Sequence, residues 1–215
     1  MPDRPPDTTH RTSAGRRARV IGVLGGIASG KSAVARFAAG EHGVVIDADE
    51  HARLVLEEPT VRTAIRARFG ADVMTQGGAV DRERLAAIVF GSQDERSALE
   101  AFTHPRIRDR IRAQLDAARA AGSPRIALDV PLLLENDAQH GLVAECDELW
   151  FVDAALAQRD ARAVERRGWK AGEVARREAL QMPLDRKRAR ADHVLSNHGS
   201  LSDLEAAVRR ILASH

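Results

Sequence analysis

The chain has 215 residues, of which 44% are apolar and 30% are charged, and its formal net charge is +2. This length suits one domain with a sizeable core, and this composition is that of a soluble globular protein. No stretch approaches the roughly 20 apolar residues that a membrane span needs, and so balanced a charge does not predict binding to nucleic acid. The single cysteine, Cys146, excludes an internal disulfide and a multi-cysteine metal site, which agrees with a reducing, cytoplasmic location.

The first residues differ in composition from the rest of the chain. Residues 1–18 contain several prolines and arginines and no apolar core, so we expect a disordered leader followed by one domain over residues 19–215. The first element of that domain is a β-branched apolar run over residues 20–24, bounded by glycines, which is typical of a buried parallel strand. A helix should begin at about Gly30.

Further short apolar runs predict four more strands. They cover residues 44–46, 126–130, 149–152 and 193–195. Helical patterns lie between or after them, at about 154–168, 171–181 and 200–213. Because strands that alternate with helices indicate a parallel sheet covered on both faces, we expect a three-layer α/β/α fold with about five strands.

The stretch from residue 50 to residue 123 interrupts this alternation, because it is far longer than one crossover helix requires. Its pattern predicts five helices, at 50–57, 60–69, 81–90, 93–102 and 105–121. Asp81 stands where a helix N-cap belongs. We therefore expect a helical subdomain inserted into the α/β domain.

A glycine-rich segment follows the first strand. Residues Gly25–Ser32 fit the pattern G-x-x-x-x-G-K-[ST] of a P-loop, placed between a strand and a helix as its mechanism requires. In such a loop the backbone N–H groups face phosphate oxygens, the lysine neutralises the β- and γ-phosphates, and the serine ligates Mg²⁺. We therefore expect ATP and Mg²⁺ to bind, with phosphate contacts from Gly26, Ile27, Ala28, Ser29, Gly30, Lys31, Ser32 and Ala33.

The P-loop names a ligand and not a reaction, since GTPases, motor-type ATPases and transporters also have one. A small GTPase would need an Asn-Lys-x-Asp element to recognise guanine. None of the three lysines in this chain follows an asparagine, which disfavours a GTPase.

Carboxylates stand at the ends of the second and third strands, where ligands of open α/β sheets bind. Asp49 is the candidate general base, because kinase chemistry needs a carboxylate to accept the proton of the acceptor hydroxyl. Asp47 has the same access, but it is equally well explained as the N-cap of the next helix. Asp129 could hold Mg²⁺ through water.

A lid is predicted over about residues 158–185. Arg162 and Arg166 are four residues apart on one predicted helix and could close over phosphates, since arginine binds phosphate oxygens with two N–H groups. A solvated helix face balanced by Asp160 and Glu165 is the alternative for either arginine.

Taken together, the motifs of residues 20–212 resemble the dephospho-CoA kinase family, which has a P-loop kinase fold. The matching elements are Gly25–Ser32, Val45–Asp49, Phe69–Gly70, His104–Pro105, Asp129–Glu135, Gln181, and Ala191–Asn197 with Gly199. The resemblance implies ATP-dependent phosphorylation of the ribose 3′-hydroxyl of dephospho-CoA, which gives CoA and ADP. It implies a small-molecule substrate and no obligate protein, nucleic-acid or membrane partner.

The resemblance also implies roles for individual residues. Asp49 would be the base and Arg166 the lid arginine that contacts the transferring phosphate. The acceptor pocket would be shaped by Asp47, His104, Leu132 and Glu135, and the adenine of ATP would lie near Asn197. For two of these we also expect structural alternatives: His104 could cap a helix that begins at Pro105, and Asn197 could belong to a turn before Gly199.

Two positions depart from the family pattern. Ala28 replaces a glycine of the loop, and Ala33 replaces a threonine after Ser32. An alanine methyl fits position 28 only if φ is negative there, so the loop geometry is expected to differ slightly. Two other functions stay open: a kinase for another small acceptor, such as a nucleoside monophosphate, and a non-enzymatic ATP-binding switch.

Overall fold

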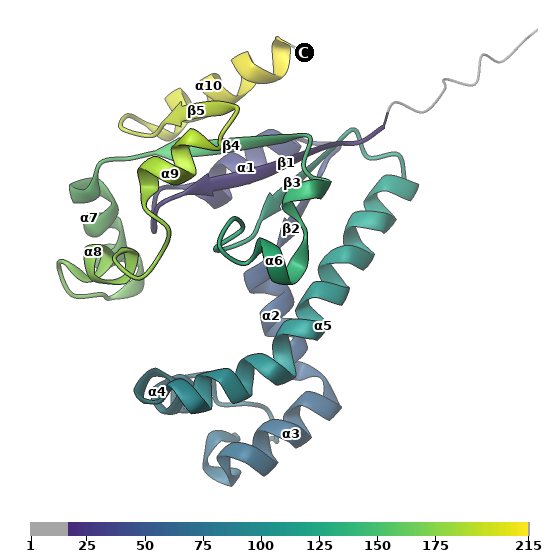
Figure 1. Ribbon diagram of the computed structural model, residues 1–215, viewed down its shortest axis with the longest axis vertical. Helices are drawn as coiled ribbons and strands as arrows, with labels where there is room; N and C mark the ends of the chain where they lie inside the picture. The colour runs from purple at the N-terminus through teal and green to yellow at the C-terminus, as the bar shows by residue number, and fades with distance from the viewer. Residues whose placement is uncertain (1–16, 215) are drawn as a thin grey trace, which may run out of the picture.

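Five parallel strands form one sheet at the centre of the computed structural model, which describes residues 17–214 (Figure 1). They are β1 (Arg19–Gly25), β2 (Val44–Asp47), β3 (Arg125–Asp129), β4 (Glu148–Asp153) and β5 (His193–Ser196). Their spatial order is β2-β3-β1-β4-β5, and every paired neighbour runs parallel. All five predicted strands are found within one residue of their predicted ends, and the α/β fold is confirmed.

The two faces of β1 explain why its sequence is apolar throughout. Val20 and Leu24 face one layer of the core, whereas Ile21 and Val23 face the other. The first layer includes α5 (Gln93–Ala120), and the second includes α1 (Lys31–Ala39) and α10 (Leu201–Ala213). A parallel strand buried on both faces has no polar side to alternate with, so the run is continuous.

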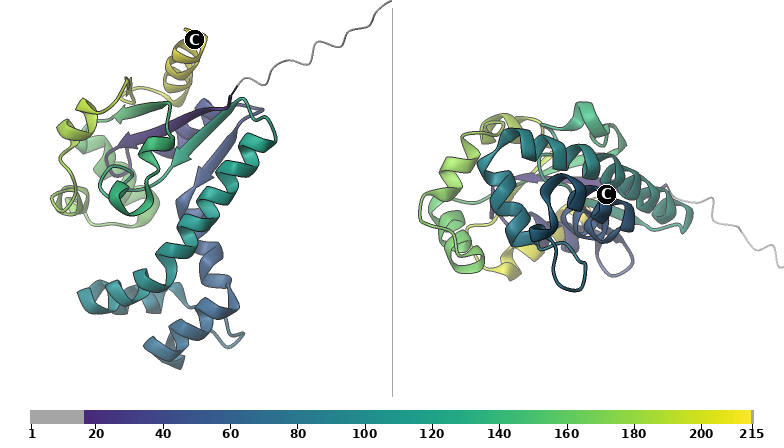
Figure 2. Two further views of the ribbon diagram at one scale, coloured as in Figure 1. Left: turned by 45° about the vertical axis from the view of Figure 1, so that its right-hand side comes forward. Right: turned by 90° about the horizontal axis from the view of Figure 1, so that it is seen from below.

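The helical insertion projects away from the sheet (Figure 2). It contains α2 (Ala48–Glu57), α3 (Pro59–Phe69), the short 3₁₀ helix η1 (Ala71–Val73), α4 (Arg82–Gly91) and the first part of α5. It has a small core of its own, formed by Val55, Val61, Ile65, Val73 and Leu85. Asp81 caps α4 as predicted, because its side chain accepts a hydrogen bond from the Arg84 N–H at 3.1 Å.

One prediction about the insertion is wrong. The helices expected at 93–102 and 105–121 are a single helix, α5, with Pro105 inside it. Proline deprives the Ala101 carbonyl of its helical donor, which usually kinks a helix, and Figure 1 shows α5 bent along its length. Nearby, the Arg106 side chain donates to the Phe102 carbonyl at 3.0 Å. Packing against α2 and β2 therefore outweighs the local cost of the proline.

The chain after β4 forms α7 (Leu156–Arg167), α8 (Glu173–Glu178) and α9 (Leu184–Ala189). Helix α9 was not predicted, because four of its six residues are charged and show no apolar period. Two further short elements, α6 (Asp137–His140) and the 3₁₀ helix η2 (Val143–Glu145), follow β3 and were also not predicted.

The predicted leader lies almost wholly outside the described residues. Ala18, which the sequence assigns to it, is buried in the core, so the domain begins before the predicted residue 19. No helix within residues 17–214 is both long and apolar enough to cross a membrane.

Candidate active site

A cleft of about 1280 Å³ opens at the carboxyl ends of the strands. Its floor is the loop between β1 and α1, and its walls come from α4 of the insertion and from the segment that carries α7 and α8. Most of the residues singled out in the sequence line this cleft. They are Ile27, Ala28, Ser29, Gly30, Lys31, Ser32, Ala33, Asp49, Asp129, Leu132, Glu135, Arg162, Arg166 and Asn197.

The floor has the curled backbone of a phosphate-binding loop. Gly25 and Gly30 take positive φ angles of 146° and 103°, which side chains of L-residues rarely adopt. Lys31 folds back over the loop, and its Nζ donates to the carbonyls of Gly26 at 2.9 Å and Gly25 at 3.2 Å. Burial lowers the pKa of Lys31 to about 8, and the neighbouring Asp129 carboxylate opposes that shift.

Ala28 overturns one expectation about the loop. Its φ is +57°, so it lies in the left-handed region and not at the negative angle expected for an alanine. An L-residue pays about 1–2 kcal/mol for this conformation. Such a residue persists where its surroundings fix the backbone on both sides, and the contacts of Ile27 and Ser29 described below do so.

Ser32 and Asp129 lie together at the end of the loop. The Ser32 hydroxyl hydrogen-bonds the Asp129 carboxyl, whose pKa is raised by burial. A hydroxyl and a carboxylate are hard oxygen ligands of the kind that Mg²⁺ takes when phosphates complete its coordination. Within the described residues no cluster of three or more His, Cys, Asp or Glu side chains could hold a metal by itself. The site therefore fits Mg²⁺ shared with phosphates.

The two aspartates after β2 differ in their surroundings. Asp47 caps α2, because its Oδ1 accepts from the N–H groups of Asp49 at 2.8 Å and Glu50 at 3.2 Å. Asp47 is not among the residues that line the cleft, whereas Asp49 lines it with an exposed side chain. Of the pair, Asp49 is thus the carboxylate that is free to meet a substrate.

Arg162 and Asn197 both bind the Ser29 carbonyl of the P-loop. Asn197 is buried, and its Nδ2 donates to the Ser29 carbonyl at 2.6 Å. Arg162 donates to the carbonyls of Asn197 at 3.1 Å and Ser29 at 3.5 Å. A side chain at position 30 would collide with Asn197, since a Cβ on Gly30 would lie 2.4 Å from its Nδ2. Arg166, one turn further along α7, has an exposed side chain that lines the cleft.

On the acceptor side, Leu132 and Glu135 line the cleft but His104 does not. Leu132 has a φ of +55°, which is strained for a leucine. His104 is exposed in the middle of α5, so it caps no helix, and its assignment to the acceptor pocket stays a prediction.

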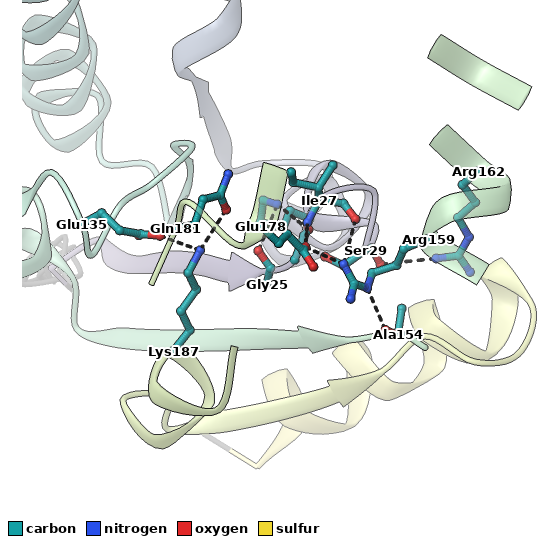
Figure 3. Close-up of polar contacts among 12 residues, drawn as sticks. Gly25, Ile27, Ser29, Glu135, Ala154, Arg159, Arg162, Glu178, Gln181 and Lys187 are labelled. Carbon is teal, nitrogen blue, oxygen red and sulfur yellow. Dashed lines mark hydrogen bonds and ion pairs between the residues drawn. The ribbon is translucent and has the colours of Figure 1, made fainter. Parts of the chain in front are cut away.

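A buried lysine on the acceptor side of the cleft was assigned no role from the sequence. Lys187 on α9 is 4% exposed, and its Nζ lies 2.6 Å from Glu135 Oε1 and 3.4 Å from Gln181 Oε1 (Figure 3). The scarcity of lysine was the available signal, since only three occur in the chain. Glu135 is therefore half of an ion pair, a role that its motif did not indicate.

The sequence also missed an aromatic contact across the mouth of the cleft. The Arg177 guanidinium lies 4.0 Å from the ring centre of Trp169 and 4.8 Å from that of Phe90 on α4. Both distances suit a cation–π interaction. The contact joins the predicted lid to the insertion.

The central strand of the parallel sheet ends in a P-loop, and a carboxylate and arginines line the same cleft. This arrangement defines a P-loop phosphotransferase. The family model described as dephospho-CoA kinase matches residues 19–203. The chain belongs to the dephospho-CoA kinase family. It is accordingly an ATP-dependent kinase of dephospho-CoA, in the biosynthesis of coenzyme A.

Individual relatives agree with this family. The chain is 42% identical over 193 residues to a dephospho-CoA kinase from Parasynechococcus marenigrum, covering 89% of this chain and 94% of that protein. It is 37% identical over 195 residues to one from Shouchella clausii, covering 90% and 96%. Among solved structures it is similar to a Thermus thermophilus protein, with 34% identity, a TM-score of 0.72, and 93% and 98% of the two chains covered. The dephospho-CoA kinase from Campylobacter jejuni shares the fold at 22% identity, with a TM-score of 0.65 over 92% and 97%.

Proposed function

We propose that this cleft transfers the γ-phosphoryl group of ATP to the ribose 3′-hydroxyl of dephospho-CoA, with Asp49 as the base. The observation that carries the proposal is that Asp49 and Lys31 line the same cleft although they come from different strand ends. Within residues 17–214, the Asp49 carboxylate has no hydrogen-bond or ion-pair partner, and it lines the same cleft as a loop of the phosphate-binding type.

The P-loop would bind the triphosphate. The loop leads directly into the N-terminus of α1, where the helix dipole favours an anion. Lys31 would leave the carbonyls of Gly25 and Gly26 and donate to the β- and γ-phosphates, which supply more charge than two carbonyl dipoles. Arg166, which is exposed and lines the cleft, would be the lid residue that contacts the γ-phosphate as charge spreads over its oxygens.

Asp49 would accept the proton of the 3′-hydroxyl while that oxygen forms its bond to the γ-phosphorus. The bond between the γ-phosphorus and the oxygen bridging it to the β-phosphate breaks, and ADP leaves with that electron pair. Asp49 then returns the proton to water. When bound, Mg²⁺ would supply positive charge that offsets the negative charge of the phosphates. Ser32 and Asp129 are the residues proposed to hold it, Asp129 through water.

The insertion and the strained turn after β3 would hold the acceptor. Leu132 and Glu135 line the cleft on this side, and Lys187 fixes the Glu135 carboxylate. We include Asn197 as a neighbour of the ATP adenine. Its Nδ2 is already bound to the P-loop, so only its remaining edge is available. A cytoplasmic location is part of the proposal and is supported by the use of a single cysteine.

Coupled ADP release tests the choice of acceptor. We expect turnover with dephospho-CoA and none above background with nucleoside monophosphates. The reverse result would assign the cleft to a different acceptor.

Asp49→Asn tests the chemistry and separates a kinase from an ATP-binding switch. The variant should bind ATP nearly as well as the wild type but turn over about 10²-fold more slowly or worse, since a general base contributes about that much. Glu50→Gln is the matched control, because Glu50 is exposed on the same helix and does not line the cleft. Unchanged turnover in Asp49→Asn would show that Asp49 is not the base.

A further inference from the structure

Behind the P-loop lies a buried ion pair that the reaction scheme does not use. Arg159 on α7 and Glu178 at the end of α8 have side chains that are 5% and 13% exposed. Their carboxylate and guanidinium are hydrogen-bonded to each other (Figure 3). Burying two charges is costly unless additional hydrogen bonds satisfy them, so the remaining partners of the pair show what it holds in place.

Those partners belong mainly to the P-loop. Glu178 Oε1 accepts from the Ile27 N–H at 2.6 Å, and Arg159 Nη1 donates to the Ile27 carbonyl at 3.4 Å. Arg159 Nε donates to the Ala154 carbonyl, after β4, at 2.9 Å. The pair therefore holds both polar groups of Ile27 and connects them to the sheet.

Because trans peptides are planar, these contacts also fix the direction of the backbone N–H groups that would donate to phosphate. In such a peptide the C=O and the N–H point in opposite directions. With the Ile27 N–H on Glu178, the Gly26 carbonyl points the other way, where it accepts from Lys31 Nζ. With the Ile27 carbonyl on Arg159, the Ala28 N–H points away from the Arg159 guanidinium.

The Ser29–Gly30 peptide, two peptides further along the loop, is held in the same manner. The Ser29 carbonyl accepts from Asn197 Nδ2, so the Gly30 N–H is directed away from Asn197. Within residues 17–214, the N–H groups of Ala28 and Gly30 donate to no other group. Anchoring the carbonyls of Ile27 and Ser29 thus leaves these two N–H groups unused, and it also fixes the strained backbone of Ala28 between the two anchors.

We propose that Arg159 and Glu178 are positioning residues for phosphoryl transfer, which fix Ile27 so that the Ala28 N–H is aimed at the triphosphate before ATP binds. The role rests on the proposed function of the P-loop. Arg159 has a second task, because without it the Glu178 carboxylate would stand unpaired beside the phosphates and repel them. Donors that are already oriented cost no reorganisation when charge develops.

Three variants distinguish the effect of orienting the P-loop N–H groups from the effect of the charges on Arg159 and Glu178. Arg159→Lys keeps a cation beside Glu178 but cannot bind Glu178, Ile27 and Ala154 together, because an ammonium lacks the fixed fork of a guanidinium. Arg159→Gln removes the cation, and adding Glu178→Gln to it removes the unpaired anion. The control is Arg209→Gln, which breaks an exposed Arg–Glu pair on α10.

The probe is inorganic tripolyphosphate, whose binding is measured by calorimetry without acceptor or turnover. We expect Arg159→Lys to weaken its binding about tenfold, Arg159→Gln to weaken it further, and the double variant to recover part of the loss. The KM for ATP should rise in parallel, the KM for dephospho-CoA should stay unchanged, and Arg209→Gln should match the wild type.

Tripolyphosphate binding of wild-type strength in folded Arg159→Lys would overturn the proposal. Equal rises in both KM values would also overturn it, since general loosening of the fold would produce them. If the Arg159 variants do not fold, Glu178→Ala alone decides, because it removes the acceptor of the Ile27 N–H and the partner of Arg159. Loss of the anion by itself would strengthen anion binding, so an affinity for tripolyphosphate equal to or above that of the wild type would refute the role. Because this assay needs no acceptor, it can fail or succeed independently of the assignment of dephospho-CoA.

Discussion

The lowered pKa of Lys31 predicts that triphosphate binding weakens above neutral pH. In the free protein, burial brings this pKa from 10.5 to about 8. A bound triphosphate would raise it again, because opposite charge nearby favours the protonated form. ATP binding above pH 8 must therefore be coupled to uptake of a proton by Lys31.

The size of the fall in ATP affinity follows from how far the pKa of Lys31 is lowered. At pH 9 about nine tenths of the free protein would carry neutral Lys31, so the affinity should fall about tenfold between pH 7 and pH 9. The terminal phosphate has a second pKa of about 6 and does not titrate in this range. The assay is calorimetry at pH 7, 8 and 9 in buffers of different ionisation enthalpy, which measures proton uptake directly.

Lys31→Arg is the matched control. A guanidinium stays protonated throughout, so this variant should bind ATP more weakly but with no slope between pH 7 and pH 9. A flat profile in the wild type would refute the reasoning. An equal slope in both proteins would assign the titration to another group.

The same shift in the pKa of Lys31 determines the direction in which the free energy of unfolding changes with pH. Between pH 8 and 10.5 the unfolded chain holds the Lys31 proton and the folded one has lost it. The contribution of this group to the free energy of unfolding therefore increases as the pH rises through that window.

Three further predictions concern packing and reactivity. Gly22→Ala should lower the free energy of unfolding by about 1–3 kcal/mol in urea titrations, because the new Cβ would lie 2.7 Å from Leu149 Cδ2; Gly91→Ala, which meets nothing within 4 Å, should be nearly neutral. Ala28→Gly should raise that free energy by up to about 1 kcal/mol, since relief of the left-handed conformation exceeds the entropic cost of glycine, and a loss would contradict the strain. Burial raises the pKa of Cys146 to about 12, so iodoacetamide at pH 8 should label it far more slowly in the native than in the unfolded protein, and equal rates would refute its burial.

Local patterns were enough to predict most of the fold and the phosphate side of the site. The strands were found because a strand buried on both faces is apolar at every position, as β1 is. The P-loop was found because its backbone needs Gly25 and Gly30 at fixed spacing from Lys31. These constraints act within a few residues, so the sequence displays them directly.

Long-range packing determines the structural features that local sequence patterns did not predict. Contacts of α5 with α2 and β2 carry that helix through Pro105 although the local signal predicts a break. The partner of Glu135 is Lys187, 52 positions away, on a helix with no apolar period.

The conformation of Ala28 shows the same division most clearly. The motif around it predicts that phosphate binds there, because glycine, lysine and serine at that spacing are typical of a phosphate-binding loop. Its positive φ depends on the anchors from Arg159 and Asn197, which lie more than 130 residues away in sequence. Only the folded chain brings those side chains behind the loop, so only the tertiary structure could decide how its donors are aimed.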